Sequence, residues 1–292
     1  MNPENQTPSQ PQFQPQPAQP NVLTIPLAII IAGVVIAGGI VATKYVGAPS
    51  TSTPKTTAAT ASMPFVAVTA DDHILGKFGA DLTFVEYSDP ECPFCKVFHG
   101  TMHQILSDYG IDSGKITWVY RHLPLYKPDA TGRALHSRAG KEAEATECAN
   151  ELGGNEAFWK LTDLVYQTTT SNFTLDPAQL PIIAGKVGLD VNTFNTCLAS
   201  GKYKAKVDQQ YAEGFAAGAQ GTPFIIVVSK KKITGAMQDK IIANILAVFS
   251  KIAPQSTVPP DLVSFDTDGT RVPFSGALPI EIVKSMIDTL TK

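Results

Sequence analysis

The sequence is poor in charge and in cysteine. Its 23 Lys and Arg nearly balance 26 Asp and Glu, for a formal net charge of −3, whereas a nucleic-acid partner usually requires a strongly basic surface. Four cysteines in 292 residues are too few for a miniprotein built on disulfides. Phosphate-binding loops, dinucleotide fingerprints and the G-x-S-x-G elbow of hydrolases are also missing. We therefore expect no nucleic-acid partner and no organic cofactor.

The first 63 residues differ from the rest in composition. Residues 1–21 are rich in Pro and Gln, carry only the charge of Glu4, and should be disordered. Residues 22–43 contain no charge and, at about 1.5 Å per residue, are long enough for a hydrocarbon core of about 30 Å. We predict one uncleaved transmembrane anchor there, because a cleavable signal peptide has a basic start and a shorter apolar stretch. Residues 44–63 are predicted to be a flexible linker.

Residues 64–292 have a globular composition, with enough apolar residues to bury a core without a metal or disulfide staple. The patterns predict strands over 81–88, 116–122, 224–229 and 271–274. Helices are predicted over 93–109, 134–152, 156–167, 177–187, 191–217 and 279–290. This order predicts an α/β fold with one large helical insertion over about 129–217.

A second insertion is predicted over about 230–270, between the last two strands. It contains an amphipathic run with an apolar face of Ile241, Ile245, Val248 and Ile252. We expect this segment to be peripheral to the catalytic core, because insertions between adjacent strands are tolerated. Its apolar face would dock on the domain or on a partner.

The chemistry is expected in the segment FVEYSDPECPFCKVFH, which contains Cys92 and Cys95. Pro93 favours a helix start, so Cys92 should lie at the helix N-terminus, where unpaired N–H groups and the helix dipole stabilise a thiolate. We expect Cys92 to be exposed with a pKa below about 8.5. Cys95, one turn later, should be shielded and able to form a disulfide with Cys92.

A metal site is the alternative interpretation of these cysteines, because His99 and His103 follow on the same helix. Cys92 and His103 would be about 16 Å apart along the helix axis, so the four side chains cannot share one tetrahedral ion. A carrier that binds metal through the two cysteines alone remains an alternative. We predict no metal site, and we expect His73, His99, His103 and His136 on the surface.

The segment resembles the active site of DsbA-like thiol–disulfide oxidoreductases, which have a thioredoxin fold with a helical insertion. GTPF at 221–224 resembles the cis-proline loop of that family, and RHLPL at 121–125 resembles the end of its second core strand. Segments 145–166 and 194–203 resemble its helical insertion. The resemblance covers about 65–228 and resumes near 271.

The resemblance implies roles for individual residues. Cys92 would be the attacking thiolate and Cys95 the resolving thiol. Pro223 would follow a cis peptide bond, with Thr222 facing the disulfide and offering backbone hydrogen bonds to an extended substrate peptide. Glu86 matches an acidic position of the family. It would be partly buried with a raised pKa and relay protons to Cys95, unless it is a carboxylate at a solvated strand end.

The sequence also departs from the family pattern. Phe94 stands where strongly oxidising members have His, which removes a group that favours the thiolate. Glu91, beside Cys92, should disfavour the thiolate electrostatically. The 230–270 segment replaces a direct turn between two strands.

Cys148 and Cys197 lie in predicted helices of the insertion, in segments that resemble the family. A structural disulfide is the favoured interpretation in an oxidising compartment, where it would stabilise the fold by about 4 kcal/mol in the chain-entropy model. Two free thiols and a second redox-active pair are the alternatives.

We expect a membrane-tethered oxidoreductase that introduces disulfides into exported proteins with free thiols and is reoxidised by a membrane oxidase or other electron-transfer partner. A reductase or isomerase of the same fold is the first alternative, because the direction depends on the reduction potential. Lys44 and Lys55 mildly favour a cytoplasmic domain. The cysteines, which suit an oxidising space, favour an extracytoplasmic domain on the cell membrane.

Overall fold

The computed structural model describes residues 64–292. The predicted tail (1–21), membrane anchor (22–43) and linker (44–63) lie outside the described residues. Among the helices of 64–292, none is both long enough and apolar enough to cross a membrane.

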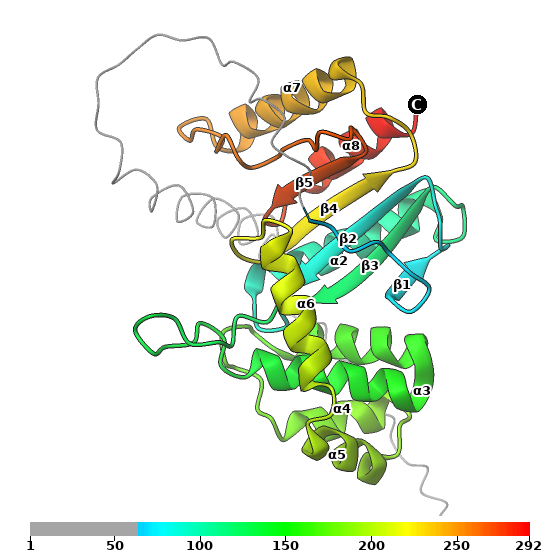
Figure 1. The fold of residues 1–292 in the computed structure, drawn as a ribbon, viewed down its shortest axis with the longest axis vertical. Helices are drawn as coiled ribbons and strands as arrows, with labels where there is room; N and C mark the ends of the chain where they lie inside the picture. Colours follow the sequence, from blue (N-terminus) through cyan, green and yellow to red (C-terminus); the bar gives the residue numbers. More distant parts are fainter. Residues whose placement is uncertain (1–63) are drawn as a thin grey trace, which may run out of the picture.

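Five strands form one mixed sheet at the centre of the domain (Figure 1). They are β1 (His73–Gly76), β2 (Leu82–Ser88), β3 (Ile116–His122), β4 (Phe224–Ser229) and β5 (Arg271–Ser275). Their order in the sheet is β1-β3-β2-β4-β5. Only β2 and β3 run parallel, and the other three pairings are antiparallel. The four predicted strands are present, and the sequence analysis missed β1.

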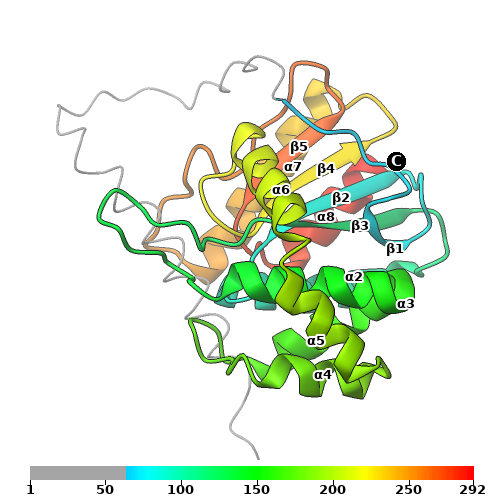
Figure 2. The ribbon, with the colours of Figure 1, turned by 60° about the horizontal axis from the view of Figure 1, so that its bottom comes forward.

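Helices cover both faces of this sheet, and α6 lies across one face while α2 and α8 lie on the other (Figure 2). The helices are α2 (Pro93–Tyr109), α3 (Ala139–Thr168), α4 (Gln179–Val187), α5 (Val191–Ser200), α6 (Lys204–Ala216), α7 (Gly235–Ile252) and α8 (Ile280–Leu290). Because both faces are covered, the central strands are apolar on both sides. In β2, Leu82 and Phe84 contribute to the core under α2 and α8, whereas Val85 and Tyr87 contribute to the core under α6.

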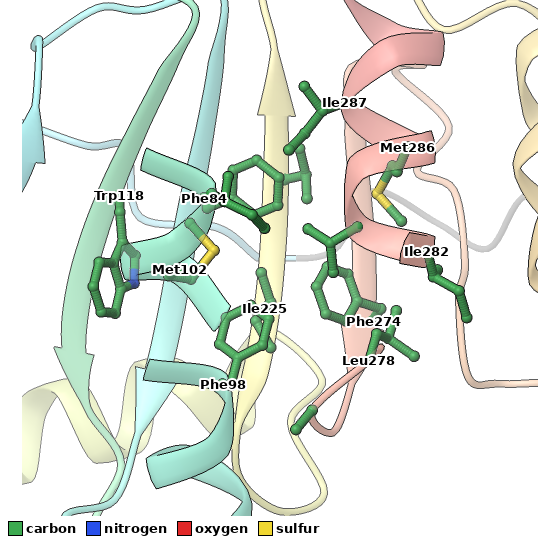
Figure 3. Packing of buried hydrophobic residues seen from close by; sticks show 14 of the residues in the cluster. Phe84, Phe98, Met102, Trp118, Ile225, Phe274, Leu278, Ile282, Met286 and Ile287 are labelled. Atoms are coloured by element: carbon green, nitrogen blue, oxygen red, sulfur yellow. The ribbon is translucent and has the colours of Figure 1, made fainter. Parts of the chain in front are cut away.

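The largest core lies between the sheet and the pair α2 and α8 (Figure 3). Strand residues Phe84, Trp118 and Ile225 are fully buried or nearly so there. They pack against Phe98 and Met102 of α2 and against residues of α8. Cys92 and Cys95 belong to the same core.

The helical insertion is present, and its helix boundaries differ from the prediction in part. The predicted helices 134–152 and 156–167 correspond to the two parts of α3, which a kink at Gly154 (φ 69°) separates where the sequence predicts a break. The first part begins at Ala139 instead of 134. The predicted helix 191–217 is two helices, because Gly201 adopts a left-handed conformation (φ 64°) at the end of α5. Glycine at such a C-terminal position is a common helix stop.

Cys148 of α3 and Cys197 of α5 form a disulfide, as expected, with 5.9 Å between their Cα atoms. Both lie in a second, smaller core formed within the insertion. The disulfide therefore joins two helices of the insertion and is separate from the cysteine pair of α2.

The expectation of surface histidines is wrong for His73, His99 and His136, which are all buried. His73 belongs to β1 and His99 to α2, and both have hydrogen bonds to carboxylates of α3. Buried imidazoles need such partners. The partners lie 74 and 64 residues away in sequence, so local patterns could not reveal them.

The 230–270 segment is more closely integrated than expected. It contains α7, which packs on α8, and Asn244 of α7 donates a hydrogen bond to Ser285 of α8 at 2.5 Å. Ile241, Ile245 and Phe249 are buried and belong to the core that includes Cys92 and Cys95. Of the two expected partners for this apolar face, the structure shows the domain itself.

Truncation of α7 side chains should separate the buried face from the exposed one. Ile245→Ala should lower the free energy of unfolding by about 2–5 kcal/mol, because it leaves a cavity in the core. Leu246→Ala is the matched control, since Leu246 is 50% exposed and its truncation should change stability by no more than about 0.5 kcal/mol. Urea unfolding measures both, and equal small effects would contradict the packing of α7.

Candidate active site

The cysteine pair lies at the junction of β2 and α2. Cys92 is the N-cap residue of α2, and Pro93 occupies the first turn. Both thiols are free, and the residues Cys92 and Cys95 are 4% and 0% exposed. The expectation that Cys92 is exposed is therefore wrong. It is covered from the loop before β4, where the Cys92 thiol donates a hydrogen bond to the Thr222 carbonyl oxygen at 3.4 Å.

The two thiols differ in acidity. A hydrogen bond from Cys95 lowers the pKa of the Cys92 thiol, with a further contribution from Thr222, although burial and the charge of Asp89 oppose it. Burial raises the pKa of Cys95 well above its ordinary value, and the interaction with Cys92 adds to this increase. Cys92 is therefore the member of the pair that forms a thiolate, which matches the expected asymmetry.

The loop before β4 contains the expected cis peptide bond, between Thr222 and Pro223. The Pro223 carbonyl accepts a hydrogen bond from the Gly276 N–H at 2.8 Å, which ties the loop to the end of β5. The Thr222 hydroxyl is buried and has no hydrogen-bond partner among residues 64–292. The loop thus places the Thr222 backbone directly beside the sulfur of Cys92.

Glu86 is completely buried in the middle of β2. Ser88 donates a hydrogen bond to one of its carboxyl oxygens at 2.6 Å, and the Trp118 indole N–H donates to the other at 2.9 Å. Burial raises the pKa of Glu86 to about 8, against the opposing effect of these hydrogen bonds. The alternative of a solvated strand-end carboxylate is therefore wrong, and Glu86 is a neutral acid near pH 7.

A polar network extends from Glu86 toward Cys95. The Ser88 hydroxyl lies 3.0 Å from the Tyr166 hydroxyl, which donates a hydrogen bond to the Asp89 carbonyl oxygen at 3.2 Å. The Asp89 backbone N–H in turn donates to the sulfur of Cys95 at 3.4 Å. Glu86 is thus close enough to raise the pKa of Cys95 by its charge.

Sequence reasoning missed a buried ion pair at the site, between Asp89 and His136. The imidazole Nδ1 lies 2.8 Å from the Asp89 carboxylate, which also accepts hydrogen bonds from the backbone N–H groups of Leu125 and Glu91. Burial opposes protonation of His136, but the Asp89 carboxylate raises its pKa to about 9. The charge of a Cys92 thiolate acts in the same direction. The His136 imidazole and a Cys92 thiolate are therefore close enough to interact electrostatically.

Glu91 makes contacts that its sequence position does not suggest. Its carboxylate accepts hydrogen bonds from the backbone N–H groups of Arg138 and Ala139, both at 3.1 Å, at the start of α3. Burial raises its pKa. The pKa of Glu142, in the first turn of α3, is raised to about 8 by burial and by the charges of Glu91 and Asp89. The carboxyl groups of Glu91, Asp89 and Glu142 are therefore close enough to interact electrostatically.

A family model described as thioredoxin matches residues 68–247. This chain belongs to the thioredoxin family. Among curated relatives, this chain is similar to the Na(+)/H(+) antiporter NhaA 3 of Salinispora tropica, with 29% identity over 192 residues. The aligned region covers 65% of this chain and 27% of that relative. This chain is 32% identical over 160 residues to NhaA of Herminiimonas arsenicoxydans, over 55% of this chain and 23% of that protein. The chain thus spans about a quarter of the length of these relatives.

Solved structures that superpose on this chain include DsbA proteins. Pseudomonas aeruginosa DsbA2 superposes with a TM-score of 0.50 and 20% identity, over 76% of this chain and 96% of that one. Wolbachia pipientis α-DsbA1 superposes with a TM-score of 0.53 and 20% identity, over 76% and 92% of the two chains. The fold of this thioredoxin-family chain is therefore DsbA-like, as the sequence motifs predict.

The predicted site residues of this thioredoxin-family chain separate into two groups. Cys92, Cys95, Glu86, Thr222 and Pro223 lie around the start of α2. Cys148 and Cys197 lie in the separate core of the insertion. The site also includes Asp89 and His136. The place of Asp89 in the site could have been found from the sequence, since it precedes Cys92 by three residues. His136 lies 47 residues from Asp89, and no local pattern connects it with the site.

Replacement of Glu86 by Gln should change how stability depends on pH. The pKa of Glu86 is raised from 4.5 to about 8 in the folded chain. Between these values folding takes up a proton, so this group's contribution to stability is lost as the pH rises. Glu86→Gln cannot titrate. The free energy of unfolding of Glu86→Gln minus that of wild type should therefore increase steadily from about pH 5 to about pH 8.

Urea unfolding of the reduced proteins at several pH values measures this difference. Glu156→Gln is the control, because Glu156 is an exposed carboxylate of α3 whose pKa is lowered by Lys160. Its titration falls below the tested range. A difference for Glu86→Gln that stays constant over the range would contradict a buried neutral carboxyl group.

Proposed function

We propose that this thioredoxin-family chain is a thiol–disulfide oxidoreductase that introduces disulfides into exported proteins. The observation that carries the proposal is the asymmetry of the cysteine pair. Cys92 combines a lowered pKa with a position beside the cis-proline loop, whereas the pKa of the fully buried Cys95 is raised. An attacking and a resolving thiol need this difference, because the thiolate is the reactive form.

In the proposed reaction, a substrate thiolate attacks the Cys92 sulfur of the oxidised pair. A mixed disulfide forms, and Cys95 leaves as a thiolate that takes up a proton. A second thiolate of the same substrate then attacks the substrate sulfur of the mixed disulfide, which releases Cys92 as a thiolate. The substrate loses two electrons as its disulfide forms, and the cysteine pair gains them.

Glu86 is proposed to supply the proton that Cys95 takes up. As a neutral acid with a pKa of about 8, it can give up a proton near neutral pH. Its Ser88 and Tyr166 partners connect it with Asp89, whose N–H contacts the Cys95 sulfur. The Thr222 backbone, beside Cys92, is proposed to hold the substrate peptide in an extended conformation.

The direction of electron flow is proposed to be oxidation of substrates. Stabilisation of the Cys92 thiolate favours the reduced pair and makes its disulfide more oxidising. The Cys95 and Thr222 hydrogen bonds, which lower the pKa of Cys92, support this direction against burial and the charge of Asp89. Turnover then requires a membrane oxidase or another electron-transfer partner that reoxidises the pair. Supply of electrons by a partner would reverse the reaction and make the protein a reductase or isomerase.

Cys95→Ala should accumulate mixed disulfides with substrate proteins, because the attacking thiol remains and the resolving thiol is lost. Cys92→Ala is the matched control and should accumulate at least about tenfold fewer, since the pKa of its remaining thiol is raised. Non-reducing gels of cell extracts quenched with acid measure the trapped species. Equal trapping by both variants, or trapping through Cys95 alone, would overturn the roles.

The same extracts distinguish the alternative functions. Wild-type protein isolated mainly with the Cys92–Cys95 disulfide supports the oxidising direction, and mainly reduced protein supports the reductase. Metal bound by the reduced cysteine pair, without any trapped substrate, would support the carrier function instead.

We also propose that the domain is extracytoplasmic and is attached to the cell membrane through residues 22–43. The uncharged run, the following linker and the Cys148–Cys197 disulfide support this location. Protease added to intact spheroplasts should remove the domain from the cells, as detected with an antibody against it. Protection in intact spheroplasts with digestion only after lysis would place the domain in the cytoplasm.

A further inference from the structure

A second group of ionisable side chains lies one to two turns further along α2 from Cys95. It comprises His99 and His103, one turn apart on α2, and Asp163 of α3. The two Nε2 atoms lie 2.7 and 2.9 Å from the same Asp163 oxygen and 3.2 Å from each other. Two imidazole nitrogens and one carboxylate oxygen therefore converge on a single point.

These distances are close to those of a metal site. Zinc binds imidazole nitrogen at about 2.0–2.1 Å and carboxylate oxygen at a similar distance, so neighbouring ligand atoms of a tetrahedral site lie about 3.3 Å apart. The two nitrogens already have nearly this separation. The Asp163 oxygen, at 2.7 and 2.9 Å from the nitrogens, would need to withdraw by about half an ångström to reach this spacing.

In this cluster the His99 side chain is held by its packing, whereas His103 and Asp163 are accessible to solvent. His99 is 5% exposed, and its ring packs against Trp118 at 5.0 Å and Trp159 at 6.3 Å between centroids. The side chains of His103 and Asp163 are 39% and 30% exposed. An ion could thus enter from solvent and keep water in its remaining coordination positions.

We propose that His99, His103 and Asp163 bind a divalent transition-metal ion of the zinc class, through the two Nε2 atoms and one carboxylate oxygen. Two imidazoles and a carboxylate are ligands that zinc accepts in open sites with three protein ligands. This site is separate from the cysteine pair, and the sequence analysis did not predict it. Asp163 was the missing ligand, 60 residues beyond His103.

A comparison within the chain supports this choice. His73, His122 and Glu147 also lie close together, but the Lys206 ammonium lies 2.7 Å from the Glu147 carboxylate and 3.3 Å from His73 Nε2. That cluster already contains a cation. Among the described residues, no Lys or Arg forms an ion pair with Asp163, whose partners are the two histidines.

Isothermal titration of the full chain with Zn²⁺ tests the proposal. The protein is first oxidised at Cys92 and Cys95, so that these thiols cannot bind the ion. Residues 1–63 contain no His or Cys that would compete. We expect one Zn²⁺ per chain, with affinity reduced at least about tenfold in His103→Gln and in Asp163→Asn. Both substitutions are at partly exposed side chains, and circular dichroism checks that the variants fold.

Asp108→Asn is the matched control. Asp108 is a carboxylate of the same helix that pairs with Lys284 and Gln104, away from the cluster, so its replacement should leave zinc affinity unchanged. No zinc uptake by the oxidised wild type would overturn the proposal. Equal uptake by folded His103→Gln and Asp163→Asn would also overturn it, since the ion would then be bound elsewhere.

Discussion

Burial of ionisable side chains between the sheet and the helical insertion is the constraint on which the rest of this structure depends. A charged group removed from water costs about several kcal/mol unless it is paired and hydrogen-bonded. In this structure, buried ionisable side chains pair across separate helices and strands. Glu147 of α3 meets His122 at the end of β3 and His73 of β1. These hydrogen bonds outweigh burial and hold the pKa of Glu147 far below its ordinary value. They also attach the insertion to the sheet.

The same constraint determines the chemistry of the site, because partners differ from one carboxyl group to the next. Among residues 64–292, the hydrogen-bond partners of Glu86 are the uncharged Ser88 and Trp118, so burial dominates and raises its pKa. Asp89, three residues later, has His136 as a partner, and the pair raises the pKa of the imidazole. The segment 86–89 therefore provides both a neutral acid, Glu86, and the carboxylate of Asp89, which pairs with the His136 cation.

Several features of the fold were predictable because their signals are local. Runs of β-branched, aromatic and apolar residues predict the four longer strands, and Pro93 marks the start of α2 within the CxxC segment. Helix boundaries in the insertion depend on glycines. The pair Gly153-Gly154 is a local signal, and the two parts of α3 are separated by a kink at Gly154. Gly201 is a single glycine within a helical pattern, and only its left-handed conformation in the structure shows that α5 ends there.

The sequence by itself determined the α/β order of elements and the position of the cysteine pair, and its resemblance to DsbA-like proteins implied the cis-proline loop. Each of these signals is a short run of neighbouring residues. Only the tertiary structure decided which distant groups meet. It buried Cys92 under Thr222 and brought His136 to Asp89 and Asp163 to His99 and His103. The physical reason is that pairing of buried charges depends on how β2, α2 and α3 pack together. That packing joins residues 47 to 74 positions apart, beyond the reach of any local periodicity.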